Sequence, residues 1–409
     1  MFISFTAMVN AQTELTIEGQ TYSNSDTTWL GVNIPRSSPA KLTFRNNSIT
    51  SSNTLGYMLL AGDEGSTANN NNLDNAVITG NRFNWTGTNM TVITHGLFTG
   101  HQRNIVIKYN YLNNVPMGVI RKSSNNMSDT GGAIAYNIIK GGTVGINIKG
   151  LSNVKIYNNT LYTDRTTSET WRPLIYIYKN TDRGNNSAAS GTNIYNNIFY
   201  TKYQTFAITI SQTECLTDFK CDYNIYWCEN GAPRFNIADS VKTFAEWQAL
   251  GYDTHSVVIN PDFKDFINFV PKARLNYGMT LESTWKHGLS TDAVWGTSDP
   301  ETSSQNGKWQ VGARIYKESV NIKPVKKNSR NNISIYPNPA RKFINVSNTE
   351  IYHEPHTIRI FDIAGTLCLE KLLKHDKSNK VAIDLKPGLY IIQVRTDSSV
   401  VLVQKLNIV

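Results

Sequence analysis

Residues 40–230 contain short runs in which apolar and polar residues alternate, and an asparagine follows each run. In the stretch GINIKGLSNVKIYNNTLY, Ile146 and Ile148 alternate with polar neighbours, and Asn159 interrupts the alternation before Leu161. A strand-like run followed by asparagine, any residue and a bulky apolar residue occurs seven times. The seven asparagines are Asn47, Asn81, Asn110, Asn137, Asn159, Asn197 and Asn224. Alternation with a period of two predicts β-strands.

The spacing of these asparagines indicates a repeat. Successive asparagines are 34, 29, 27, 22, 38 and 27 residues apart. The shortest spacing is 22 residues, and the others exceed it by different amounts. This pattern is typical of a solenoid, with one turn of chain per repeat plus loops of different length. Helical repeats do not fit, because the runs have period two and are rich in Ile, Val, Tyr and Thr. We therefore predict parallel strands stacked about 4.8 Å apart around one apolar core.

The recurring asparagine fits a sharp turn between two sheets of each repeat. Asparagine tolerates the left-handed backbone conformation better than most residues. Its amide can also bond to the same amide in the next repeat, as identical side chains do in cross-β assemblies. We therefore expect each repeat asparagine to adopt the left-handed conformation and to stack on the next.

The pattern resembles the right-handed parallel β-helix of the pectate-lyase-like superfamily across residues 13–315, and we place the large domain at residues 12–315. The segment FAEWQALGYDTHSVVINPDF is similar to the helix and return segment that closes many secreted bacterial β-helix proteins. Within it, Phe244, Trp247 and Leu250 form an apolar stripe suited to covering the open end of the solenoid. The runs DFINFVPKARLNYG and WQVGARIY are expected to form the last strands.

Residues 316–330 are charged and lack apolar periodicity, so they are predicted to be a linker. Residues 331–409 contain six or seven short alternating runs, which predict a small immunoglobulin-like β-sandwich. They closely resemble the type A C-terminal sorting domain of the type IX secretion system. The motifs that carry this resemblance are Tyr336-Pro337-Asn338-Pro339, the turn from Phe361-Asp362 to Gly365, Gly388-Leu389-Tyr390 and the final Val403-Gln404-Lys405 strand.

The resemblance of the C-terminal domain implies a Bacteroidetes-type bacterium, passage across the outer membrane, removal of the domain, and release or attachment at the cell surface. Residues 1–11 fit the remnant of a secretory signal peptide, with an apolar stretch before Val9-Asn10-Ala11 but no basic start. A truncated N-terminus is therefore one reading of this end. No apolar run reaches the ~18 residues that a membrane-spanning helix needs.

The net charge of +9 does not mark a nucleic-acid-binding protein. Residues 1–315 carry 25 Lys and Arg against 23 Asp and Glu, so most of the excess lies in the linker and the C-terminal domain. No basic stripe or reader module is present, and no nucleic-acid partner is expected. Cys215, Cys221 and Cys228 lack the spacing of a zinc site, which leaves one disulfide or free buried thiols as alternatives.

A row of cations is the candidate functional site. Lys122 lies twelve residues after Asn110, and Lys149 lies twelve after Asn137, so the two should stack one repeat apart. A shift of one residue would instead place Arg121 above Lys149, and both registers stay open. Aligning HGLFTGHQRN and LIYIYKN with VGINIKGLSN extends the row. The candidate catalytic residues are Lys149, Arg121, Lys122 and His101, and the candidate substrate-binding residues are His95, Tyr176, Tyr178, Lys179 and Trp171.

Cations and tyrosines in one row suit a polysaccharide that contains uronates, because cations bind carboxylates and aromatic faces carry sugar rings. They also suit β-elimination, which needs a positive group on the carboxylate and a base for the neighbouring proton. Crowded cations disfavour one another's charge, so Lys149 is the expected base. We therefore expect a secreted, monomeric polysaccharide lyase.

Two other functions stay open at this stage. A glycoside hydrolase would use clustered aspartates, but the large domain offers only Asp63, Glu64, Asp129, Asp164 and Asp182, which are scattered. A glycan-binding protein or adhesin without catalysis is the other alternative. No cofactor is assigned. Calcium stays open as an alternative, although the carboxylates Asp63, Glu64 and Asp74 are too few to define a calcium site.

Overall fold

A computed structural model describes residues 14–24, 30–34, 41–62, 73–88, 93–100, 103–123, 131–166, 169–296, 298–317, 333–348, 356–374, 378–395 and 400–409. The chain divides into two compact units, Met1–Lys317 and Glu318–Val409, and each is described by itself. The predicted signal peptide remnant, residues 1–11, and residues 318–330 of the predicted linker lie outside the described residues.

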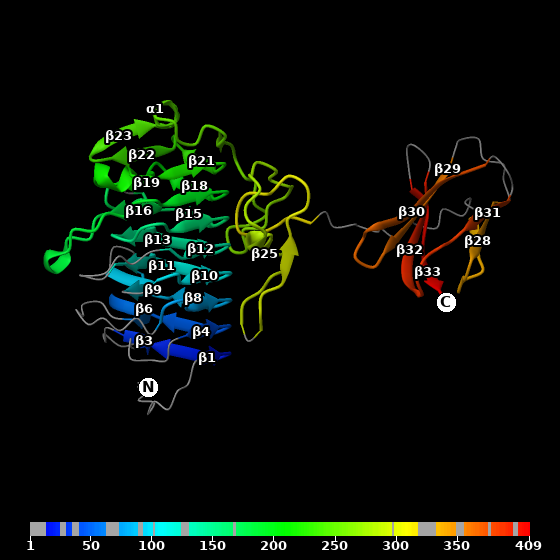
Figure 1. The fold of residues 1–409 in the computed structure, drawn as a ribbon, viewed down its shortest axis with the longest axis horizontal. Coiled ribbons are helices and arrows are strands. Elements are labelled where there is room, and N and C mark those ends of the chain that lie inside the picture. Colours follow the sequence, from blue (N-terminus) through cyan, green and yellow to red (C-terminus); the bar gives the residue numbers. More distant parts are fainter. Residues whose placement is uncertain are drawn as a thin grey trace. The chain divides into compact units, whose positions relative to one another are not determined.

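The first unit contains an eight-stranded parallel sheet in which every strand comes from a different repeat (Figure 1). Each strand pairs in parallel with the strand of the next repeat, so consecutive repeats stack directly on one another. We call this the first sheet. Its strands are β1 (Leu15–Glu18), β4 (Leu42–Arg45), β7 (Val77–Thr79), β10 (Val106–Lys108), β12 (Ala133–Ala135), β14 (Lys155–Tyr157), β17 (Asn193–Tyr195) and β20 (Lys220–Asp222).

The same repeats also build a 16-stranded sheet, which has two rows of strands. Strands β11 (Tyr111–Lys122) and β13 (Ile138–Lys149) run through both rows. The row that we call the second sheet adds β2 (Thr21–Asn24), β5 (Ser48–Ser51), β8 (Arg82–Trp85), β15 (Thr160–Thr163), β18 (Ile198–Tyr203), β21 (Ile225–Asn230) and β24 (Val257–Val258). The third sheet adds β3 (Leu30–Ile34), β6 (Leu55–Gly62), β9 (Ile93–Gly100), β16 (Ile175–Tyr178), β19 (Phe206–Ile210), β22 (Arg234–Ile237) and the antiparallel β23 (Ser240–Thr243).

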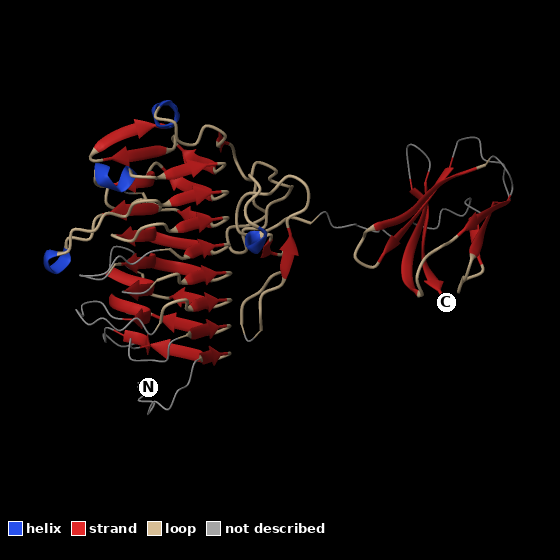
Figure 2. Ribbon diagram, viewed as in Figure 1, coloured by secondary structure: helices blue, strands red, loops and turns tan. Residues whose placement is uncertain are grey.

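Apolar side chains from all three sheets point into one interior core. In the third sheet Ile146, Ile148, Ile175 and Ile177 are fully buried in that core, and the residues between them point outward. This alternation of buried and outward residues is the one that the period-two pattern of the sequence predicts. The predicted all-β fold with stacked parallel strands is therefore confirmed, and Figure 2 shows how little helix accompanies the strands.

The seven repeat asparagines form a continuous buried ladder at the corner between the first and second sheets. In each of the six successive pairs, the backbone N–H and the Nδ2 group of one asparagine donate to Oδ1 of the next, at 2.8 to 3.1 Å. Buried amides without such partners would cost about 1–3 kcal/mol each. The predicted stacking of identical amides is confirmed.

The left-handed turn lies one residue earlier than predicted. The ladder asparagines do not have a positive φ, whereas the residue before each of them does, with φ between 53° and 67°. A side chain at this bend points out of the corner, so only the following asparagine can keep its amide in the ladder. At Gly80 a Cβ atom would lie 2.3 Å from Asn46 Oδ1 and 2.9 Å from Pro300 Cδ, so a side chain there would require both neighbours to shift. The left-handed residues are Asn46, Gly80, Tyr109, Tyr136, Asn158, Asn196 and Tyr223.

The last repeat ends the ladder with a buried carboxylate. Asn224 Nδ2 donates to Asp253 Oδ1 at 2.9 Å, and Tyr226 and Trp247 donate to Asp253 Oδ2 at 2.8 and 2.7 Å. The Cys221 thiol also donates to Asp253, at 3.0 Å. The three clustered cysteines Cys215, Cys221 and Cys228 are free and buried, which decides between the two alternatives for these residues.

Helix α1 (Phe244–Ala249) covers this end of the core. Thr243 and Glu246 form a capping box at its start, and Trp247 is fully buried. The predicted stripe is wrong at Leu250, which is 51% exposed because the helix ends before it and Leu250 is already the C-cap residue.

Residues 260–316, which we call the return segment, pass back over the corner and the outer faces of the first and second sheets. The prediction of last strands in DFINFVPKARLNYG and WQVGARIY is wrong, since these runs form turns and isolated bridges. The short elements here are η3 (Ser283–Trp285), β25 (His287–Leu289) and β26 (Thr302–Ser304).

Left-handed corner residues hold the return segment by their outward side chains. Asn158 Nδ2 donates to Gln310 O at 2.8 Å, and Tyr109 OH donates to His287 O at 2.6 Å. Asn196 exchanges two hydrogen bonds of 2.9 Å with the backbone of Met279. At this corner the asparagine ladder therefore lies on the inside, and the side chains that bind the return segment lie on the outside.

The second unit consists of two antiparallel sheets that share one apolar core. The three-stranded sheet contains β27 (Ile333–Tyr336), β28 (Phe343–Asn348) and β31 (Ser378–Ala382). The four-stranded sheet contains β29 (His356–Asp362), β30 (Leu367–Leu373), β32 (Gly388–Arg395) and β33 (Val400–Ile408).

Candidate functional site

The outer face of the third sheet carries most of the predicted site residues. Among the described residues, the apolar clusters that join the return segment to the sheets involve the first and second sheets only. On the third sheet, Asn147 and Lys149 of β13 point outward between buried isoleucines, as do Tyr176 and Tyr178 of β16. In the described residues, this outer face therefore carries polar and aromatic side chains, in contrast to the faces on which the return segment packs.

The two predicted lysines stack in adjacent repeats. Lys122 of β11 pairs in register with Lys149 of β13, and Lys149 pairs with Tyr178. The alternative register is wrong, because Arg121 pairs with Ile148 and points inward. Arg121 is 1% exposed, and it donates to Gly131 O at 2.8 Å and to Thr99 Oγ1 at 3.3 Å. Arg121 therefore has a structural role, and its predicted catalytic role is not supported by its position.

A carboxylate that the pattern of alternation did not reveal lies between the two lysines. Lys122 Nζ and Lys149 Nζ both lie 2.7 Å from Asp182 Oδ2. Burial opposes ionisation of Asp182, but hydrogen bonds and charges from the two lysines outweigh it and lower the pKa of Asp182. The lysine side chains are only 10% and 18% exposed, so these ion pairs are shielded from solvent better than ordinary surface pairs. The repulsion expected between the Lys122 and Lys149 ammonium groups is thus offset by the Asp182 carboxylate that they share.

The loop that carries Asp182 is anchored to the end of β11. Asn180 is fully buried, and its Nδ2 group donates to Ser123 O at 2.9 Å. Asn180 N also donates to Ser187 O at 2.9 Å, which closes the base of the loop in an antiparallel bridge. Asp182 itself begins the short helix η1 (Asp182–Gly184). These contacts fix the base of the loop and leave Asp182 near its tip.

Two tyrosines stack beside the lysines. The rings of Tyr176 and Tyr178 have centroids 4.5 Å apart and planes 20° apart. Lys149 Nζ lies 5.5 Å from the Tyr178 centroid, which is within the range of a cation–π contact. Burial raises the pKa of Tyr178, so this phenol keeps its proton at neutral pH. Lysine, carboxylate and paired rings thus form one continuous surface patch.

Lys179 extends the patch toward the following repeat. Its ammonium lies 2.9 Å from Glu214 Oε1, at the start of η2 (Thr213–Leu216). The hydrogen bond from Lys179 lowers the pKa of Glu214. Each described lysine of the predicted site therefore has a carboxylate partner.

The structure does not bring His95 to the lysine pair. His95 pairs with Met117 and Gly100 with Lys122, so His95 lies five residues, roughly 16 Å, farther along the strands. It stacks on Tyr57 with centroids 5.1 Å apart, and burial lowers the pKa of His95 to about 4. Trp171 is 48% exposed in the β15–β16 connection under the Arg172 guanidinium. His101 lies outside the described residues.

Sequence reasoning missed that the loop places Asp182 beside the lysine pair. Asp182 was considered only among the scattered carboxylates of a glycoside hydrolase. A signal was present in the spacing, because 38 residues separate Asn159 from Asn197 against a minimum of 22. Such an excess indicates an insertion, and insertions in solenoids map to loops that often lie on the binding face.

Two of the described carboxylates that were considered for a hydrolase or calcium site are paired with cations. Asp74 is paired with Arg103 at 2.8 Å, and Asp182 is held by the lysines. Within the described parts of the chain, no group of three or more His, Cys, Asp or Glu side chains could hold a metal ion. Asp63, Glu64 and Asp129 lie outside the described residues, so the calcium alternative stays untested.

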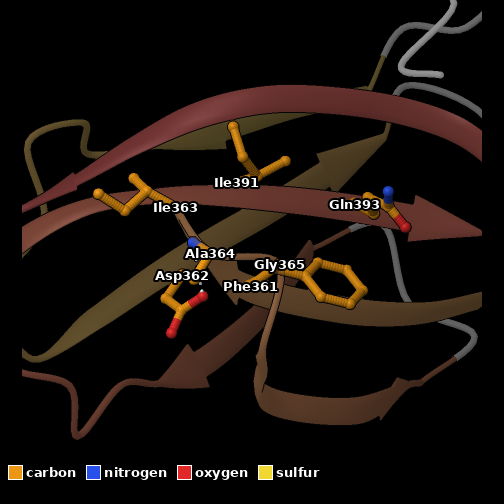
Figure 3. Close-up of a pocket in the computed structure, with 7 residues that line it drawn as sticks. All are labelled: Phe361, Asp362, Ile363, Ala364, Gly365, Ile391 and Gln393. Carbon is orange, nitrogen blue, oxygen red and sulfur yellow. Dashed lines mark hydrogen bonds between the residues drawn. The ribbon is translucent and has the colours of Figure 1, made fainter. Parts of the chain in front are cut away.

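The second unit has a separate hollow of about 220 Å³ beside the turn from Asp362 to Gly365. Figure 3 shows the Asp362 carboxylate facing the backbone of this turn, where its Oδ1 accepts from Ala364 N at 2.9 Å. The hollow is lined by Phe361, Asp362, Ile363, Ala364, Gly365, Ile391 and Gln393. It belongs to the second unit and is not part of the lysine patch.

Comparison with known proteins identifies only this second unit. Residues 334–409 match the family described as the secretion system C-terminal sorting domain. No curated protein and no solved structure matches the chain. The sorting domain directs its carrier across the outer membrane through the type IX secretion machinery, so the protein is secreted or displayed at the cell surface. No helix among the described residues is long and apolar enough to cross a membrane.

Proposed function

We propose that the first unit is a right-handed parallel β-helix of the pectate-lyase-like type and that the sorting domain has an immunoglobulin-like fold. The stacked parallel strands and the asparagine ladder support the first part of this proposal. The two antiparallel sheets around one core support the second. A fold of this kind presents long flat faces, which suit extended polymers.

We infer that the outer face of the third sheet binds a polysaccharide that contains uronates. The observation that carries this inference is the pair Lys122 and Lys149, one repeat apart, beside the stacked rings of Tyr176 and Tyr178. Two ammonium groups on one oxygen form a carboxylate-binding arrangement, and tyrosine faces provide platforms for sugar rings. Export to the cell surface brings this face to the compartment where such polymers occur.

The reaction that fits these groups is β-elimination. Lys122 would neutralise the uronate carboxylate, and Lys149 would take the proton from the adjacent carbon. The bond to the leaving oxygen then breaks as the carbon–carbon double bond forms. Tyr178, which keeps its proton and lies beside Lys149, would donate a proton to the leaving oxygen.

A binding protein without catalysis is the second candidate, and Asp182 is the observation that favours it. Both lysines are engaged by that carboxylate, and a base must be free of such a partner to accept a proton. A glycan-binding module requires only that a uronate carboxylate can compete for the same ammonium groups.

One experiment separates these functions. The full chain is incubated with pectate, alginate and glycosaminoglycans, and the ultraviolet absorbance of the unsaturated uronate product is followed alongside reducing ends. Rising absorbance that is lost in Lys149→Ala identifies a lyase, and reducing ends alone identify a hydrolase. Binding without either signal identifies a binder. Failure to bind any acidic polysaccharide contradicts the proposal.

A further inference from the structure

The lysine pair on the third sheet is occupied by a side chain of the same protein. Asp182 reaches Lys122 and Lys149 with a single oxygen, Oδ2, at 2.7 Å from each ammonium. A carboxylate held between two cations is also the arrangement that a bound uronate would need. The internal ion pair therefore has the chemistry of a substrate contact.

The loop around Asp182 is built so that its tip can change while its base stays in place. Asn180 and Asn185 are buried and both bond to Ser123, at 2.9 and 3.4 Å from their Nδ2 groups. Between them, the Asp182 side chain is 37% exposed, and a Cβ on Gly184 would meet nothing within 4 Å. Rotation of the Asp182 side chain into water would thus release both lysines without unfolding the loop.

We propose that Asp182 is an internal occupant of a carboxylate-binding site formed by Lys122 and Lys149, and that the carboxylate of an acidic sugar displaces it. This inference rests on the proposed function, because it assigns the substrate contact and its regulation to the same patch. The apparent affinity of such a site is the intrinsic affinity reduced by the fraction of molecules in which Asp182 is released. Removing the Asp182 charge therefore strengthens binding of an acidic glycan.

A neighbouring pair provides a matched control. Lys179 and Glu214 form one ion pair at 2.9 Å on the same side of the stack, and Glu214 is at the surface. Replacing Glu214 by glutamine removes one negative charge, as Asp182→Asn does, but it frees only the single ammonium of Lys179 and leaves the lysine pair engaged. The two variants have the same net charge, so general attraction of an acidic polymer is equal in both.

The test measures binding of oligogalacturonate to the full chain by titration calorimetry at low ionic strength. Asp182→Asn is expected to bind about tenfold more tightly than the wild type, whereas Glu214→Gln changes affinity less than about twofold. Sulfated dextran and neutral dextran are titrated in parallel, and the gain should be largest for the uronate. Equal or weaker binding in Asp182→Asn than in Glu214→Gln would overturn the inference.

A second readout does not depend on any glycan. Acylation of Lys122 and Lys149 by an amine-reactive reagent, followed by peptide mapping, should be several-fold faster in Asp182→Asn than in Glu214→Gln. Unchanged acylation would overturn the inference even if acidic glycans bind. Faster acylation together with no binding of any acidic polymer would overturn the proposed function and leave Asp182 as a structural contact.

Discussion

The corner between the first and second sheets and the outer face of the third sheet come from the same repeats, but they are organised differently. At the corner, seven successive repeats supply the same residue, and its amide makes the same bonds at 2.8 to 3.1 Å. On the third sheet, Lys122, Lys149 and Tyr178 occupy one register position in three successive repeats. The identical residues at the corner hold the repeats together. The different residues on the third sheet give one part of its outer face a distinct chemistry.

The two regions also differ in how their polar groups are satisfied. The ladder amides are buried and bond mainly to one another and to backbone carbonyls. The lysines of the third sheet are satisfied by Asp182, a side chain from an inserted loop. A ligand cannot replace the first kind of contact without unfolding the chain, whereas it can replace the second.

The largest expected effect is at the middle of the ladder. Asn137→Ala removes hydrogen bonds to Asn159, Ile107 and Ala135 and leaves the backbone N–H of Asn110 without its acceptor. We expect a loss of about 3–5 kcal/mol in the free energy of unfolding, measured by chemical denaturation. Asn84→Ala is the matched control, because this asparagine accepts one bond of 2.7 Å on the second sheet and should cost less than about 1 kcal/mol. Equal losses in the two variants would contradict the distinct role of the ladder.

The end of the ladder should be nearly as sensitive. Asp253 is fully buried, and asparagine there would place an amide donor against Asn224, Tyr226 or Trp247. Asp253→Asn is therefore expected to lower the free energy of unfolding by about 2–4 kcal/mol in the same measurement. A change below about 0.5 kcal/mol would show that the last repeat does not need this carboxylate.

These two regions also show what could be predicted from sequence. The ladder was predictable because its asparagines recur with one pattern. Counting along it left two registers open, Lys122 over Lys149 or Arg121 over Lys149, and the strand pairing has the first. The left-handed residue before each asparagine was missed because Asn, Gly and Tyr all occupy that position. Asp182 was missed because it lies in an inserted loop, outside the alternating runs on which the prediction was based. The path of the return segment depends on contacts such as Asn158 with Gln310, which are distant in sequence.

A smaller, pH-dependent effect is expected from His95 on the third sheet. Burial lowers its folded pKa from 6.5 to about 4, so the unfolded chain binds more protons in that interval. Stability from this group is full above pH 6.5 and is lost as the pH falls toward 4. The wild type should lose about 2 kcal/mol more than His95→Gln across this interval in denaturation series. Parallel pH profiles would show that His95 does not contribute.

The smallest effect on stability is expected at the lysine pair, where binding should change instead. Lys149→Ala removes one ammonium from the shared contact with Asp182 and should alter the free energy of unfolding by less than about 1 kcal/mol. Its affinity for oligogalacturonate should fall about tenfold, which corresponds to about 1.4 kcal/mol. Lys155→Ala is the control, because Lys155 pairs with Glu282 at 2.8 Å on the first sheet, away from the patch. Equal affinities in the two variants would remove the patch from the binding site.

Hydrogen–deuterium exchange of the full chain with and without oligogalacturonate tests the central claim most directly. The account predicts slower exchange in the C-terminal halves of β11 and β13 and in residues 175–187, with no change in the return segment over the corner. Slower exchange confined to the return segment, or unchanged exchange throughout under saturating ligand, would contradict the assignment of the binding face to the third sheet.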